Sequence, residues 1–147
     1  MAKRRIDGGA RLGALVEAAK GLAHPARLRL LGMLATGELC VCQMTAVIGL
    51  APSTVSRHLS VLARGGLVAE RKEGKLVFYR LNEEGIAADL LAALVGELAT
   101  DATAKADRAE IVRLRRIPVA TLCAADLDLV AIGVRRPSAA PRPTAGA

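Results

Sequence analysis

Residues 38–62 read ELCVCQMTAVIGLAPSTVSRHLSVL and contain two helical patterns separated by a turn. The first pattern runs from about Cys40 to Ile48 and repeats apolar residues at helical spacing. Gly49 marks a tight turn, and Pro52 marks the entry of a longer helix that runs to about Ala63, capped by Ser53 or a residue beside it. A short helix, a glycine-containing turn and a longer helix are typical of the helix-turn-helix motif.

The longer helix has one apolar face and one polar face. Val55, Leu59 and Leu62 recur at the spacing of a buried stripe. The opposite face carries hydroxyls and hydrogen-bond donors: Ser53, Thr54, Ser56, Arg57, His58 and Ser60. Such side chains can reach base edges and phosphates in a major groove, so we expect these residues to bind DNA. The alternative is an ordinary amphipathic helix with a solvated polar face.

A basic hairpin is predicted directly after this helix. Residues 67–72 and 75–81 have strand-like composition, and Glu73-Gly74 between them indicates a tight turn. Residues 52–82 contain six basic side chains against two acidic ones. The hairpin therefore reads as the wing of a winged helix, with Arg71, Lys72 and Lys75 as its candidate DNA contacts.

Helices are expected on both sides of this unit. The N-terminal side has apolar periodicity over residues 10–22 and 25–35, the second with Leu28, Leu31 and Leu34 as its buried stripe. On the C-terminal side, Asn82 is expected to cap a helix over residues 83–100. The apolar stripe of that helix is wide for a terminal helix, which favours burial against the same helix of a second subunit. We predict a mainly α protein with a small β-hairpin, homodimeric, with residues 1–100 as its DNA-binding and dimerisation domain.

The composition limits the class of partner. The 147 residues carry a formal net charge of +7 and have a pI near 10.0, which favours a polyanion such as double-stranded DNA. Phe78 and Tyr79 are the only aromatic residues, so we do not expect a single-strand binder built on base stacking. The start MAKRRIDGG lacks the apolar segment of a signal peptide, and no apolar run reaches the roughly 18 residues of a membrane span. We expect a soluble cytoplasmic protein with no membrane partner.

Residues 101–147 are predicted to form a C-terminal extension. Residues 102–116 can form a charged helix that Pro118 ends, and residues 119–134 are apolar and include Cys123. Residues 135–147 are rich in proline and alanine and are expected to be disordered.

The chain has three cysteines, of which Cys40 and Cys42 are separated by one residue. An odd number with this spacing does not suggest a disulfide framework, so we expect reduced thiols. Thiolates near a helix N-terminus have a lowered pKa and bind thiophilic ions. Residues two apart on a regular helix point to different sides. Both sulfurs can therefore meet one ion only if the first turn is unwound or absent, and we expect that distortion to displace the recognition helix. The alternative is that the cysteines pack as small hydrophobes.

Three segments together resemble the arsenic-repressor (ArsR/SmtB) family of bacterial metal-sensing repressors. They are HPARLRLLGML (24–34), ELCVCQM (38–44) and APSTVSRHLSVLARGGLVAERKEGKLVFYRL (51–81). The resemblance covers about residues 12–100. It implies a winged helix-turn-helix homodimer that pairs through its first and last helices and leaves its operator when a metal or metalloid binds.

The resemblance also shows where this chain departs from the family. In the arsenic sensors, a third cysteine follows ELCVC three residues later, and Thr45 stands at that position here. Either the site has two sulfurs, suiting a methylated arsenical or an exchangeable third ligand, or Cys123 completes it. Other members hold zinc, cobalt or nickel on the last helix, but residues 83–100 contain no histidine.

The leading hypothesis is a repressor of a metalloid-resistance operon, needing no cofactor to bind DNA and induced by trivalent arsenic or antimony. A second hypothesis keeps the fold but makes the input a redox-active dithiol, cadmium or lead. A third is a thiol reductase. We expect no enzyme, because the sequence places no base near the thiols and has no glycine-rich nucleotide motif.

Overall fold

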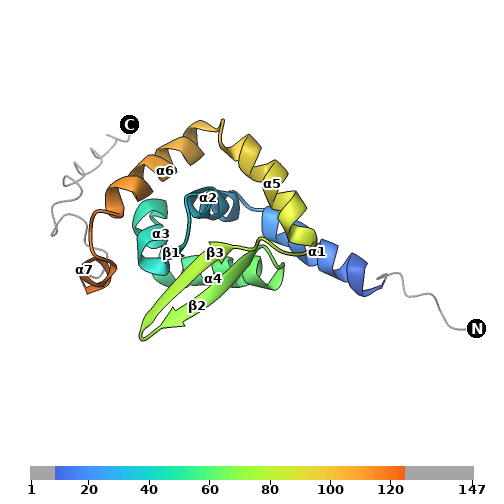
Figure 1. Cartoon of the computed structure of the whole chain (residues 1–147), viewed down its shortest axis with the longest axis horizontal. Helices are drawn as coiled ribbons and strands as arrows, with labels where there is room; N and C mark the ends of the chain where they lie inside the picture. The colour runs from blue at the N-terminus through green and yellow to red at the C-terminus, as the bar shows by residue number, and fades with distance from the viewer. Residues whose placement is uncertain (1–8, 125–147) are drawn as a thin grey trace, which may run out of the picture.

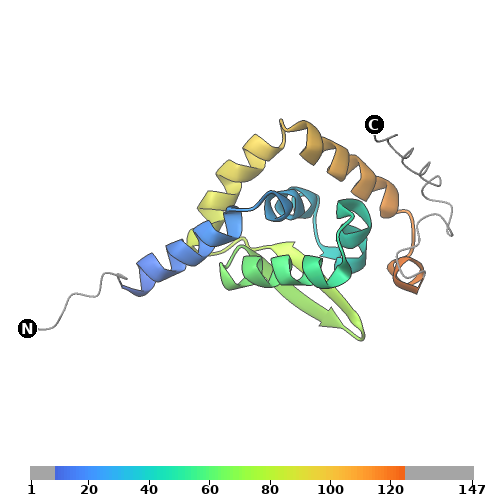
Figure 2. The same cartoon turned by 180° about the vertical axis from the view of Figure 1, so that it is seen from behind.

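The computed structural model describes residues 9–124, which form seven helices and one small sheet (Figures 1 and 2). The elements in chain order are α1 (Ala10–Leu22), α2 (Pro25–Leu34), β1 (Leu39–Cys40), α3 (Val41–Ile48), α4 (Pro52–Arg64), β2 (Val68–Glu73), β3 (Leu76–Leu81), α5 (Ile86–Leu98), α6 (Ala102–Leu114) and α7 (Val119–Ala124).

Helices α3 and α4 form the predicted helix-turn-helix. Gly49 ends α3 in the left-handed region at φ 75°, a conformation that glycine adopts at no steric cost. The predicted cap at Ser53 is wrong: Ala51 is the N-cap of α4, without a side-chain hydrogen bond. Pro52 already has the φ of a first helical residue, so the helix begins before Ser53.

The wing is part of a three-stranded antiparallel sheet with the strand order β1-β3-β2. The pairing of Glu73 with Leu76 places the turn at Gly74 and Lys75, one residue later than predicted. Strand β1 was not predicted, because two residues carry no periodic signal. It pairs Leu39 with Tyr79 and Cys40 with Phe78, which joins the start of α3 to the wing.

The hydrophobic core lies between α2, α3, α4 and α6. The predicted stripe of α4, Val55, Leu59 and Leu62, is fully buried. For α2 the prediction was partly wrong: Leu31 and Leu34 are buried, but Leu28 is only half-buried. Helix α2 packs against α3, α4 and α6, so it buries more than one stripe, including Leu30 and Met33.

Helix α1 packs closely on the end of α4. A Cβ added at Gly65 would lie 2.8 Å from the backbone oxygen of Glu17, so only glycine allows this approach. The outer side of α1 remains exposed, with Leu12 at 54% and Val16 at 50%.

Helix α5 starts at Ile86, with Gly85 as its N-cap at φ 76°. The predicted cap at Asn82 is wrong, because Asn82 binds the chain elsewhere: its Nδ2 donates to the Gly66 oxygen at 2.9 Å, and its Oδ1 accepts the Glu84 N–H at 3.2 Å. Residues 83–85 thus form a turn that connects the wing to α5.

Helices α5 and α6 form an arc over α2, and α7 lies beside α3 (Figures 1 and 2). Ile111 and Leu114 of α6 enter the core, and Asp107 pairs with Arg29 of α2 through two 2.8 Å hydrogen bonds. The predicted break at Pro118 is confirmed, since it falls between α6 and α7. The predicted disordered tail, 135–147, and most of the apolar segment 119–134 lie outside the described residues. None of the described helices has both the length and the apolar character needed to span a membrane.

Candidate thiol site and nucleic-acid interface

Cys40 stands at the junction of the sheet and the helix-turn-helix. It is the N-cap of α3, with extended backbone angles of φ −73° and ψ 149°, and it is 1% exposed. Its N–H donates to Oε1 of Gln43 at 2.9 Å, one half of a reciprocal capping box between these two residues. The backbone therefore places the Cys40 sulfur at the N-terminus of α3.

Cys42 lies in the first turn of α3 and is bonded to Cys123 of α7. The two Cα atoms of this disulfide are 5.6 Å apart although 81 residues separate them in sequence. The expectation of three reduced thiols is thus wrong for this pair, whereas Cys40 remains a free, buried thiol. Sequence reasoning considered only a bridge between Cys40 and Cys42, because the path of α6 and α7 back to α3 was not predictable from spacing.

The three sulfurs form one cluster. The Sγ atoms of Cys40 and Cys123 are 4.0 Å apart, and all three sulfur atoms lie within 4.8 Å of one another. Of the two conditions predicted for the C-x-C pair, an unwound first turn or an absent one, the structure meets the second, because Cys40 precedes the first helical residue. No unwinding of α3 is needed to bring the sulfurs of Cys40 and Cys42 within 4.8 Å of each other.

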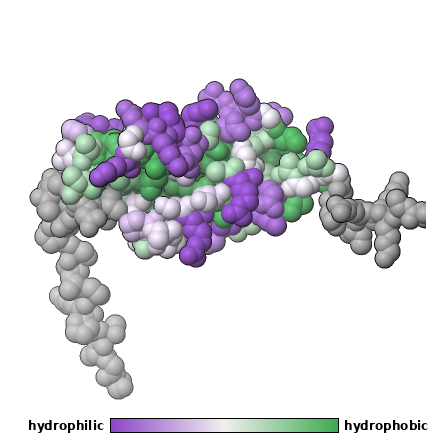
Figure 3. All heavy atoms as spheres, turned by 90° about the horizontal axis from the view of Figure 1, so that it is seen from below, coloured by the Kyte–Doolittle hydropathy of each residue, from purple (hydrophilic) through white to green (hydrophobic). Residues whose placement is uncertain are grey.

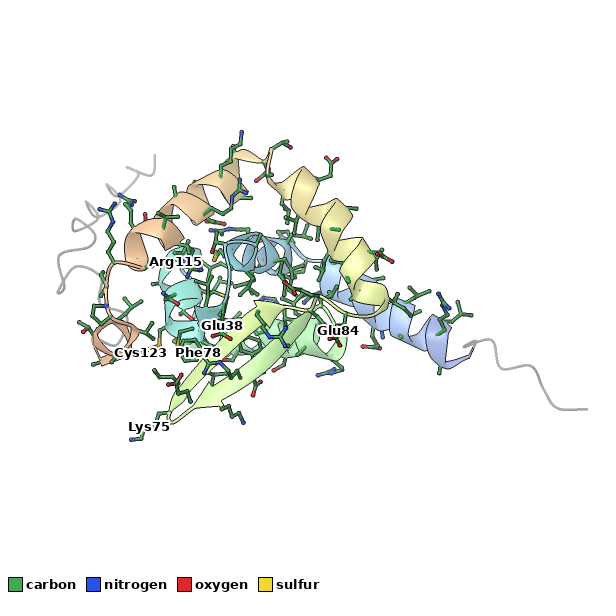
Figure 4. The ribbon with its side chains drawn as sticks, in the orientation of Figure 1. Glu38, Lys75, Phe78, Glu84, Arg115 and Cys123 are labelled. Atoms are coloured by element: carbon green, nitrogen blue, oxygen red, sulfur yellow. A yellow bond between two sulfur atoms is a disulfide. The ribbon has the colours of Figure 1, made fainter. Side chains whose placement is uncertain are left out.

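Thr45, which replaces the third cysteine of the family motif, cannot complete this cluster as it stands. Its side chain is buried, and its hydroxyl donates to the Val41 oxygen at 2.8 Å. The third sulfur comes instead from Cys123, which is on α7 beside α3 (Figure 4).

The proposed recognition helix α4 presents a mixed polar surface. Ser53, Ser56, Arg57 and Ser60 are exposed, and Thr54 is half-buried. His58 differs, because its ring lies 4.5 Å from that of His24, and its Nδ1 is 3.3 Å from Nη1 of Arg27. Burial and the nearby His24, Arg27 and Arg57 charges lower the pKa of His58.

His24 also has a structural role at the start of α2. Its Nδ1 accepts the Ala26 N–H at 3.0 Å and so caps α2. The α2 cap and the recognition helix thus meet through two imidazole rings.

The wing carries the predicted basic residues, but they differ in their surroundings. Lys75 is at the tip of the hairpin and points away from the body of the protein (Figure 4). The Nζ atom of Lys72 lies 3.6 Å from Oε1 of Glu70. Arg71 is held more firmly: it contacts Glu38 at 2.7 Å and Glu73 at 2.9 Å, and its guanidinium stacks 4.5 Å above the centre of the Phe78 ring. The partnership with Glu38 was not predicted, because it depends on strand β1.

The helix-turn-helix, the hairpin and the basic residues on both define a winged helix-turn-helix protein. A family model described as "Bacterial regulatory protein, arsR family" matches residues 24–70. The solution structure of a homodimeric winged helix-turn-helix DNA-binding domain from Mycobacterium bovis, a possible ArsR-family transcriptional regulator, aligns with a TM-score of 0.54 and 35% identity. That alignment covers 67% of this chain and 90% of the other. The chain belongs to the ArsR family, whose members are regulatory proteins and not enzymes.

Two curated relatives have names that describe different roles within the family. The biofilm growth-associated repressor of Agrobacterium fabrum is 47% identical over 75 residues, which cover 51% of this chain and 63% of that protein. The arsenic resistance transcriptional regulator ArsR1 of Pseudomonas putida is 41% identical over 66 residues, covering 44% of this chain and 52% of that protein. The matched part thus spans between about half and two thirds of these relatives.

Proposed function

We propose that this protein is a transcriptional repressor of a metalloid-resistance operon and leaves its operator when trivalent arsenic or antimony binds Cys40, Cys42 and Cys123. The observation that carries the proposal is the cluster of three sulfurs within 4.8 Å, two at the start of α3 and one on α7. The similarity to an arsenic resistance regulator supports this choice of inducer.

The chemistry of the cluster suits such an ion. Thiolates are soft ligands that select thiophilic ions over magnesium or calcium, and a helix N-terminus favours the thiolate form. Three thiolates from two elements can surround one ion in a pyramidal site. The ion binds the reduced protein, so two cellular thiols must first give two electrons and two protons to the Cys42–Cys123 bond. They form a disulfide with each other and leave both residues as thiols.

DNA binding is assigned to α4 and the wing. Ser53, Thr54, Ser56, Arg57, His58 and Ser60 of α4 are the candidates for the major groove, and Arg71, Lys72 and Lys75 are the candidates for phosphates. Figure 3 views the molecule from below the hairpin, and hydrophilic residues gather on part of this side. The net charge of +7 favours the same partner.

Dimerisation is assigned to α1 and α5. Leu12 and Val16 of α1 and Leu90 of α5 are large apolar side chains exposed in the single chain. A second copy that covers them would remove this apolar surface from water. The homodimeric relative from Mycobacterium bovis supports this arrangement.

The proposed switch acts through α3. An ion bound to Cys40, Cys42 and Cys123 ties α7 to the first helix of the helix-turn-helix. Helix α3 packs directly on α4 through the core, so a shift of α3 changes the orientation of the recognition helix.

The proposal is tested with the full-length reduced protein and a labelled DNA duplex taken from upstream of its own gene, followed by fluorescence anisotropy. We expect binding by the dimer and release on addition of arsenite. The variant carrying both Cys40→Ser and Cys42→Ser should bind DNA equally well and stay bound. Release of this double variant at the same arsenite concentration would contradict the sensing role.

A second candidate input is oxidation, and the Cys42–Cys123 bond is the observation that favours it. Hydrogen peroxide would take two electrons and two protons from these thiols, giving one disulfide and two water molecules. Release of DNA by peroxide, reversed by a thiol reductant and lost in Cys123→Ser, together with no release by arsenite, would replace the metalloid by this input.

A further inference from the structure

The wing arginine Arg71 is occupied by a carboxylate from outside the wing. Its Nη2 and Nε donate to the two oxygens of Glu38 at 2.7 Å and 3.2 Å, and its Nη1 donates to Glu73 at 2.9 Å. Paired donors of this kind are the ones that a guanidinium also uses to bind a phosphate. In this state of the protein, Glu38 takes the place that a DNA phosphate would need.

Glu38 is connected to the thiol site on both sides. Two residues after it, Cys40 provides one sulfur of the cluster and pairs with Phe78 of β3. On the other side, Arg115 follows the last residue of α6. Its Nη2 donates to Thr36 Oγ1 at 3.1 Å, to the Thr36 backbone oxygen at 3.2 Å and to the Glu38 backbone oxygen at 3.4 Å. The chain runs from Arg115 to α7 and Cys123, so the segment that contacts Thr36 and Glu38 also leads to one of the three sulfurs (Figure 4).

We propose that closure of the thiol site holds Glu38 on Arg71, so that Glu38 competes with DNA phosphate for this arginine. This inference rests on the proposed function and names the route by which the site controls the wing. When the bond from Cys123 to α3 is absent, the segment that follows α6 is tied at one end only, and Arg115 holds residues 36–38 less firmly. Arg71 then exchanges Glu38 for phosphate.

The pair is suited to such an exchange. The side chains of Arg71 and Glu38 are 49% and 33% exposed, and ion pairs this accessible to water contribute little net stability. Glu73 provides a matched control, because it contacts the same arginine but lies at the end of β2 and moves with the wing. Of the two carboxylates on Arg71, only Glu38 lies on the segment that leads to the thiol site.

The test uses the salt dependence of binding to a labelled duplex of mixed sequence, which reports phosphate contacts without requiring the operator. The full-length protein is compared after peroxide oxidation, with the Cys42–Cys123 bond verified by mass, and after reduction by a phosphine. For the wild type, the slope of log affinity against log salt should be shallower in the oxidised form than in the reduced form. The difference should be about one unit per protomer, because one phosphate contact is missing.

Each variant has a distinct expected result. Glu38→Gln should restore the steeper slope in the oxidised form and leave the reduced form unchanged. Arg71→Gln should make the slope of the reduced form shallower and leave the slope of the oxidised form unchanged. Glu73→Gln should affect both forms equally.

Two outcomes would overturn the inference: equal slopes of the two wild-type forms, or a Glu38→Gln variant whose two forms differ as much as those of the wild type. Failure of the proposed function has another signature. In that case, the wild type does not release operator DNA with either arsenite or peroxide, whatever its slopes on mixed-sequence DNA.

Discussion

At the scale of single residues, Cys40 serves three structural units at once. It pairs with the wing through Phe78, caps α3 with its extended backbone, and places its sulfur 4.0 Å from that of Cys123. A ligand on this sulfur therefore acts on the sheet and on the helix-turn-helix together. Cys40 is only 1% exposed, so a reagent reaches this sulfur only when the structure around it opens locally.

His58 gives a pH dependence that can be measured. Its pKa is lowered from the ordinary value of 6.5, mainly by burial and then by the charges of His24, Arg27 and Arg57. In the unfolded chain this ring takes up a proton as the pH falls through about 6.5, whereas in the folded protein it stays neutral to lower pH. The unfolded state then binds more protons, so stability must fall as the pH is lowered below this value.

We expect the melting temperature of the wild type to drop between neutral pH and the lowered pKa of His58, and to drop less in His58→Gln. Circular dichroism melts across this pH range measure the effect. Parallel curves for the two proteins would show that His58 does not titrate differently on folding.

The sequence identifies two of the three clustered cysteines as site residues, but it does not show that the third lies beside them. Cys40 and Cys42 are identified by their spacing and by the family resemblance, and Thr45 shows that a ligand of the family motif is missing. That Cys123 lies beside them depends on the turn after α5, on the Arg29–Asp107 pair and on the break at Pro118. Of these three, the break at Pro118 has a local sequence signal, but the contact between Arg29 and Asp107 has none.

At the scale of elements, periodicity predicted the helices better than the caps. Helix α1 has the predicted bounds, and α6 ends within two residues of its predicted end. Helix α5 begins three residues later than predicted. Gly85 at positive φ takes the N-cap position that was predicted for Asn82. Capping depends on which tertiary partner a polar side chain finds, and Asn82 finds the backbone of Gly66.

Strand β1 is the element with the largest consequence for function. Its two residues are a strand only because β3 pairs with them, so propensity could not reveal it. Without β1, the sequence suggested that the thiol site acts on the recognition helix alone. With β1 in place, the same site is also continuous with the wing.

At the scale of the whole molecule, the exposed apolar residues of α1 and α5 predict a dimer. Leu12→Glu puts a charge where a partner is expected to bury apolar surface, and we expect it to give monomers. Val112→Glu is the matched control, because Val112 on α6 has the same 54% exposure as Leu12 but lies outside the proposed interface. Analytical ultracentrifugation measures both. A dimeric Leu12→Glu, or a monomeric Val112→Glu, would move the interface away from α1.

X-ray absorption at the arsenic edge tests most directly whether two segments distant in the sequence build one three-sulfur site. The measurement uses reduced protein loaded with one arsenite per protomer, as wild type and as Cys123→Ser. We predict three sulfur neighbours around arsenic in the wild type, and two sulfurs with one oxygen in the variant. Identical sulfur shells in the two proteins, or an arsenic surrounded only by oxygen in the wild type, would contradict the account.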